Sequence, residues 1–220
     1  MDINALIAVV LVCIVLAVVC RIALNALLSY AARVNGPGAT AVNACGAMAA
    51  ASGECRPLVE CGPRACFDSK AGVLTLPTVV ADATDIAALS QACHECGHYL
   101  QWCHSPRRLR AVASASSAFR VLSWLALPLG IVAAVTHLSP VAYAAVALYV
   151  LCLLVQLALI PCEVDASRRA LVYLRSAVFA PGPLVWARCC LAAACVSYLV
   201  GALASLVDPV LSALLRVLRM

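Results

Sequence analysis

His94-Glu95-Cys96-Gly97-His98 is the stretch of sequence that decides how this chain is organised. Its two histidines are four residues apart, so on a helix they lie on one face with Cβ atoms roughly 5–6 Å apart. Both imidazoles can then reach one zinc ion at about 2.0–2.1 Å. Glu95 follows the first histidine and can reach a water molecule on the metal. The pattern therefore predicts His94 and His98 as zinc ligands and Glu95 as the general base of a hydrolytic reaction.

The residues around the motif favour a helix over about 84–103. Thr84 can cap this helix, and Asp85 suits its first turn. Gly97 costs about 1 kcal/mol against Ala inside a helix. A glycine beside a ligand histidine suggests that another backbone approaches closely. Cys96 is expected to face away from the metal, roughly 200° around the helix from His94.

The composition is that of a membrane protein. Hydrophobic residues make up 65% of the chain, charged residues 11%, and the mean hydropathy is +1.02. Soluble domains have roughly 45–50% apolar and 25% charged residues. We therefore expect a mainly α-helical, polytopic membrane protein with about four transmembrane helices and, in addition, a zincin-like HExxH helix. The predicted spans are 5–28, 121–135, 141–160 and 189–206.

The arginines predict the orientation of these spans. Arginines follow the first and third spans, whereas the 136–140 turn has neither Lys nor Arg. The positive-inside rule then places the HExxH helix on the cytoplasmic side, so we expect an integral protein of the cytoplasmic membrane with the lipid bilayer as a partner. Arginines beside spans also account for the net charge of +5, and we expect no nucleic-acid partner.

The whole chain, 1–220, is expected to form one membrane domain. Residues 33–117 would be its cytoplasmic catalytic part, and 161–188 a helix and loop with a further metal ligand. Within the catalytic part, 71–77 favours a short strand, which Pro77 would either confine to a sheet edge or end. Such an edge could hold an extended peptide, or the segment is a plain connection.

Cysteines are frequent, with 14 in the chain. Four of them cluster after the first predicted span, and their spacing lacks the CxxC pair of a zinc ribbon. In a cytoplasmic segment we expect reduced thiols, with a disulfide or a second metal as the alternative. These four cysteines are Cys45, Cys55, Cys61 and Cys66.

A catalytic zinc site needs a third protein ligand besides the two histidines. Glu163 and Asp165 follow the third predicted span, and Pro161 before them suits the first turn of a new helix. Either carboxylate could bind the metal. Alternatively, both are helix-start acids, with Asp165 and Arg169 paired at i,i+4.

The segments Ala92-Cys93-His94-Glu95-Cys96-Gly97-His98 and Leu159 to Ala170 resemble the neutral zinc metallopeptidases of the YugP type. These are bacterial membrane proteins related at the site to the HtpX and CAAX prenyl protease group. The resemblance implies Zn²⁺ as cofactor, a peptide or membrane-protein substrate, and Glu163 as the third ligand. The chain departs from the family in its cysteine-rich first loop and at Cys96 and Cys162.

We therefore expect a membrane-bound zinc metalloendopeptidase that uses zinc-activated water and Glu95 as general base. Glu163 and Asp165 differ by about 200° around a helix, so only one can face the metal. Arg169 can pair with Asp165, which would then orient a neighbouring group. His104 is a weak candidate for oxyanion stabilisation. The alternative is a non-hydrolytic membrane scaffold or sensor with a structural zinc site, in which protein would fill the fourth zinc position.

Overall fold

The computed structural model describes residues 3–36, 38–136, 139–177 and 182–197. The chain divides into two compact units, and α1 (Ile3–Ala31), α5 (Pro106–Thr136) and α6 (Ser139–Ala177) each contribute to both. The first unit comprises 1–23, 114–160 and 197–220, and its described residues are helical. The second comprises 24–113 and 161–196 and contains the HExxH motif together with the small sheet.

The prediction of a polytopic membrane protein is wrong. Among the residues that the structure describes, no helix is both long and apolar enough to cross a membrane. The expected span 121–135 is shorter than the about 20 residues that a bilayer requires. The expected span 141–160 lies in α6, which continues into a charged stretch. This finding removes the basis for placing the chain in the cytoplasmic membrane with the bilayer as a partner. Residues 198–206 of the fourth expected span lie outside the described residues.

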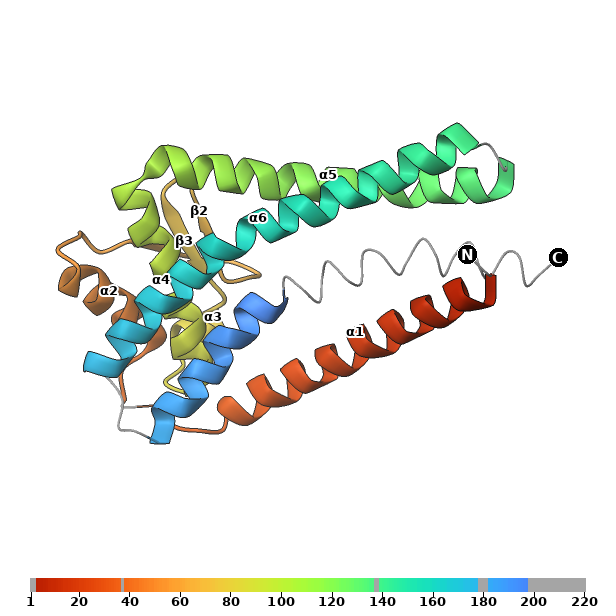
Figure 1. Cartoon of the computed structure of the whole chain (residues 1–220). Helices are drawn as coiled ribbons and strands as arrows, with labels where there is room; N and C mark the ends of the chain where they lie inside the picture. Colours follow the sequence, from red (N-terminus) through yellow and green to blue (C-terminus); the bar gives the residue numbers. More distant parts are fainter. Residues whose placement is uncertain (1–2, 37, 137–138, 178–181, 198–220) are drawn as a thin grey trace. The chain divides into compact units, whose positions relative to one another are not determined.

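The core of the second unit is built around α4 (Ile86–His104), which carries the motif (Figure 1). α2 (Ala41–Ala51) packs on α4 through small side chains, because Ala44, Cys45 and Ala92 are all fully buried. The Thr40 hydroxyl caps α2 by accepting a hydrogen bond from Asn43 N–H. Threonine is one of the residues preferred at this position.

The sheet has three strands in the order β1 (Leu58–Cys61), β3 (Val73–Leu76), β2 (Cys66–Asp68). β3 pairs in parallel with β1 and antiparallel with β2. The predicted strand therefore exists and is central. Of the two effects expected of Pro77, confinement to an edge is wrong, and termination of the strand is confirmed. Pro77 lies one residue beyond β3, so its missing N–H removes no ladder bond. An extended peptide cannot add to β3, because both of its sides are occupied.

Two predicted helix boundaries also differ in the structure. Asp85, not Thr84, caps α4: its carboxylate accepts a hydrogen bond from Ala88 N–H at 2.9 Å. The Thr84 carbonyl accepts from Gly36 N–H at 2.8 Å, which fixes it outside the helix. Pro161 does not begin a helix, since α6 runs through it without interruption. Proline lacks one helix hydrogen bond but keeps helical φ, so a long helix can absorb it.

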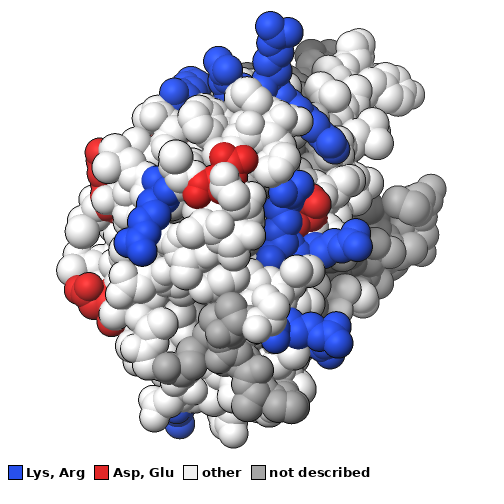
Figure 2. All heavy atoms as spheres, turned by 90° about the vertical axis from the view of Figure 1, so that its left-hand side faces the viewer, with Lys and Arg blue, Asp and Glu red and all other residues white. Residues whose placement is uncertain are grey.

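The face shown in Figure 2 is mostly uncharged. Basic side chains outnumber acidic ones on it, and carboxylates lie between the basic groups. This distribution matches the formal net charge of +5.

Candidate metal centre

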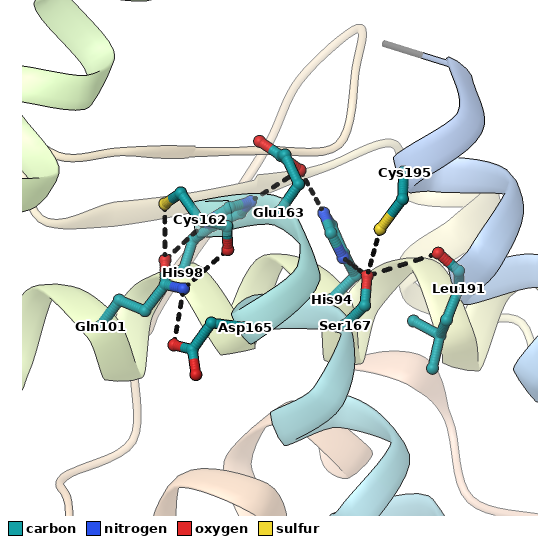
Figure 3. Close-up of polar contacts among 9 residues, drawn as sticks. All are labelled: His94, His98, Gln101, Cys162, Glu163, Asp165, Ser167, Leu191 and Cys195. Atoms are coloured by element: carbon teal, nitrogen blue, oxygen red, sulfur yellow. Dashed lines mark hydrogen bonds and ion pairs between the residues drawn. The ribbon is translucent and has the colours of Figure 1, made fainter. Parts of the chain in front are cut away.

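α4 presents His94 and His98 on one face, as their spacing predicts. The two ring centroids are 4.9 Å apart, and the ring planes are nearly perpendicular at 87°. Their side chains are mostly buried, with 8% and 14% exposed. The Nε2 atoms of both rings point toward α6 (Figure 3).

Glu163 of α6 completes a cluster of three potential metal ligands. Its Oε2 atom lies 3.1 Å from His94 Nε2 and 3.4 Å from His98 Nε2. The donor atoms of the three residues all lie within 4.8 Å of one another, so they could hold one metal ion. The structure thus brings together the two histidines and the carboxylate that the sequence comparison favoured.

A close crossing of α4 and α6 brings Glu163 to the histidines. A Cβ atom at Gly97 would lie 2.6 Å from the Ala166 carbonyl oxygen and 2.9 Å from its Cα. Ala166 itself is fully buried. The backbones of the two helices therefore meet at Gly97, and no other residue type leaves room for this contact. The expectation that another backbone approaches at Gly97 is confirmed.

The two distances from Glu163 to the histidine nitrogens fit zinc. Four ligands at about 2.05 Å in tetrahedral geometry lie about 3.3 Å from one another. The two nitrogen–oxygen distances of 3.1 and 3.4 Å bracket this value. Two imidazole nitrogens and one carboxylate oxygen are also a donor set that zinc binds in catalytic sites.

The remaining ring nitrogens have partners of their own. His98 Nδ1 lies 3.0 Å from Gln101 Oε1, and His94 Nδ1 lies 3.0 Å from Ser167 Oγ. Gln101 also reaches α6, where its Nε2 donates to Asp165 Oδ2 at 2.8 Å. Neither ring can turn without losing one of these contacts.

The charges at the centre favour a cation between its three donors. Burial would raise the pKa of Glu163, but hydrogen bonds from His94 and His98 outweigh it and hold that pKa well below its usual range. Burial would lower the pKa of His98, yet the hydrogen bonds with Cys162 and Glu163 outweigh it and raise that pKa. The carboxylate thus stays ionised and attracts positive charge, which a metal ion would supply.

Glu95 lies between the two histidines in sequence but outside the ligand cluster. Burial raises its pKa, and the positive charge of His98 acts against this effect. The backbone N–H of Phe67 in β2 donates to its carboxylate. Glu95 is not one of the three clustered residues, but the charges of His94, His98 and Glu163 all act on its pKa.

The other predicted residues lie on the side of His98 away from Glu163. Asp165 pairs with Arg169, whose Nε lies 2.9 Å from Asp165 Oδ2. His104 is exposed, and its Nδ1–H donates to its own helix at Leu100 O. These three residues line a cavity of about 260 Å³ together with Gln101. His104 does not join the ligand cluster.

Sequence reasoning missed Ser167 and Gln101. Ser167 lies four residues after Glu163 and so on the same face of α6, and Gln101 lies three residues after His98 on α4. Helical periodicity could have found both once Glu163 was chosen. Cys96 does face away, since its thiol donates to the Cys45 carbonyl of α2 at 3.4 Å. Cys45 is buried on α2, and the other three cysteines of the predicted cluster are exposed free thiols: Cys55, Cys61 and Cys66.

Comparison with known proteins agrees with this chemistry. The family model described as "Putative neutral zinc metallopeptidase" matches residues 5–219. No curated protein and no solved structure matches the chain.

Proposed function

The chain belongs to this family of neutral zinc metallopeptidases, and from that premise we propose that it is an endopeptidase with His94, His98 and Glu163 as zinc ligands. The observation that carries the proposal is the convergence of two imidazole nitrogens and one carboxylate oxygen within 4.8 Å of one another, with Glu95 next to His94 on the same helix. Zinc is the metal of the family, and a peptidase family implies peptide substrates.

The chain's own residues supply binding and proton transfer. Bound zinc would supply Lewis acidity and a lowered pKa for water at the position that the protein leaves open. Glu95 takes the proton of the attacking water and passes it to the leaving amine. Its raised pKa makes it a stronger base than an ordinary carboxylate, and the Phe67 N–H holds it in place.

A structural zinc site is the competing function, and the ligand count disfavours it. Structural sites fill the fourth zinc position with protein. Among the described residues, the cluster has three members and no fourth His, Cys, Asp or Glu. The fourth position is therefore left for water and substrate.

Metal analysis and one substitution test the proposed function. The purified protein should carry about one zinc per chain and cleave peptides from a fluorogenic mixture. A chelator should abolish cleavage, and added zinc should restore it. Glu95→Gln should keep the zinc but lose activity by about 10²–10⁴-fold, because the general base is removed while the ligands stay. Glu60→Gln, at an exposed position of β1, serves as the control and should cleave normally.

Each alternative gives a different result. Zinc lost together with activity in Glu95→Gln would make Glu95 a ligand. Full activity in that variant, or cleavage by metal-free protein, would refute the proposed chemistry.

A further inference from the structure

The candidate ligand histidines each have a partner at Nδ1, and these partners fix the protonation of the rings. The hydrogen bonds that Gln101 and Ser167 make to other residues indicate which nitrogen of each ring carries the proton. Both residues lie outside the ligand cluster, and both contact α6 or the helical residues 182–197.

Gln101 has only one possible amide orientation. Its Nε2 lies 2.8 Å from the Cys162 carbonyl oxygen and 2.8 Å from Asp165 Oδ2. Neither partner can donate a hydrogen bond, so the NH₂ group must face them. Oε1 then faces His98 Nδ1 and can only accept, which requires a proton on that nitrogen.

Asp165 and Cys162 hold the amide in this orientation. The Asp165 carboxylate is fixed by Arg169 at 2.9 Å, so its position does not depend on Gln101 alone. The Cys162 thiol donates to Gln101 Oε1 at 3.1 Å and uses the second lone pair of that oxygen. All hydrogen-bonding positions of the Gln101 amide that face α6 and His98 are thus occupied.

Ser167 can act on His94 in the same way. Its Oγ lies 3.0 Å from His94 Nδ1, 3.5 Å from Cys195 Sγ and 3.3 Å from the Leu191 carbonyl oxygen, which can only accept. When the hydroxyl proton points to Leu191, the Ser167 oxygen accepts from His94 Nδ1–H. Ser167 is buried, so no solvent competes for this contact.

We propose that Gln101 and Ser167 are positioning residues that hold His98 and His94 with the proton on Nδ1 and the Nε2 lone pair aimed at the metal position. This inference rests on the proposed zinc site. Before a metal binds, the Nε2 atoms hydrogen-bond to Glu163 at 3.1 and 3.4 Å. A metal ion would displace the Nε2 protons, and because each ring keeps its proton on Nδ1, the Nε2 lone pairs would face the metal.

Zinc affinity is the measurement that tests this role. Gln101→Leu and Ser167→Ala should each raise the zinc Kd by about 10–100-fold, as loss of partners to ligand histidines typically does. The Kd is measured by competition with a chelator of known affinity. Matched controls on α4 are Gln91→Leu at an exposed position and Ser90→Ala, whose buried hydroxyl has no hydrogen-bond partner among the described residues. Both controls should keep the wild-type Kd.

A rescue experiment separates positioning from general damage to the fold. Gln101→Glu alone places two carboxylates in contact and should weaken zinc binding. The pair Gln101→Glu with Asp165→Asn keeps an acceptor for His98 Nδ1–H and places an amide donor opposite the new carboxylate, while the Cys162 carbonyl oxygen loses its donor. This double variant should therefore bind zinc more tightly than Gln101→Glu alone.

Two results would overturn the inference. One is a wild-type zinc Kd in both Gln101→Leu and Ser167→Ala. The other is a double variant that binds no better than Gln101→Glu. If the wild-type protein itself binds no zinc, the proposed function fails, and that result is distinct from either of these.

Discussion

At the scale of single residues, Glu163 and Asp165 have different surroundings although they are two positions apart on α6. Glu163 contacts both histidines, whereas Asp165 contacts Gln101 and Arg169. Glu163→Ala should therefore weaken zinc binding by more than 100-fold, because a ligand is lost. Asp165→Ala should weaken it by about 10-fold, because only the support of His98 is lost. Chelator competition measures both, and the reverse order would exchange their roles.

Local patterns predicted some of these residues and could not predict others. His94, Glu95 and His98 follow from spacing within one helix. Glu163 lies 69 residues from His94, and it was favoured over Asp165 by resemblance to known peptidases and by the possible pairing of Asp165 with Arg169. Ser167 and Gln101 carry no motif, since serine and glutamine occur on helices for many reasons. Helical spacing places each of them on the same face as a ligand, but the contact of Gln101 with Asp165 depends on how α4 and α6 cross.

At the scale of elements, the crossing at Gly97 gives a sharp prediction. Gly97→Ala should gain helix propensity of about 1 kcal/mol, yet the protein should become less stable by about 1–3 kcal/mol. The reason is that the new Cβ would lie 2.6 Å from Ala166 O, so the helices must separate. Zinc affinity should fall as well, because Glu163 moves with α6. Denaturant midpoints and zinc competition measure the two effects.

Gly46→Ala on α2 is the matched control for that variant. A Cβ there would meet only the side chain of Arg56, at 3.1 Å, and this long side chain can move. The control should keep zinc affinity and lose no stability. Equal loss in both variants would show that the Gly97 contact has no special role.

The strand and the long helix show why element prediction failed where it did. Pro77 allowed an edge strand or a strand that ends there, and β3 ends one residue before it with both of its sides paired. Pro161 suggested a helix start, but α6 includes it. For Pro161 the residue's local preference was read correctly, and its position relative to the helix was not.

At the scale of the whole molecule, a metal held between α4 and α6 links ligand binding to folding. Zinc at 100 times its Kd should stabilise the protein by about 2.7 kcal/mol. Removing it with a chelator should therefore lower the thermal midpoint. Hydrogen exchange should speed up in residues 94–98 and 163–170, because those segments carry the ligands. The same chelator should leave Glu163→Ala unchanged, and an equal response in that variant would place the stabilising metal elsewhere.

The main error of the sequence analysis also belongs to this scale. High hydropathy predicted four spans, and no described helix qualifies as one. Part of the apolar composition is used inside the second unit, whose core is rich in small side chains. Alanine and cysteine raise the hydrophobic fraction as leucine does, but they serve close helix packing there. Fully buried examples are Ala41, Ala49, Ala92, Ala170, Cys45, Cys93 and Cys96.

The helix crossing at Gly97 also governs when the proposed peptidase can act during its own synthesis. A ribosome completes α4 long before α6, since 69 residues separate His94 from Glu163. The early chain holds two of the three ligands, and the third arrives only when α6 has docked on the glycine. If the proposed function holds, a nascent or misfolded copy lacks the complete ligand cluster and should not cleave the unfolded chains around it. The proposed activity would then depend on completion of the fold, without removal of any inhibitory segment.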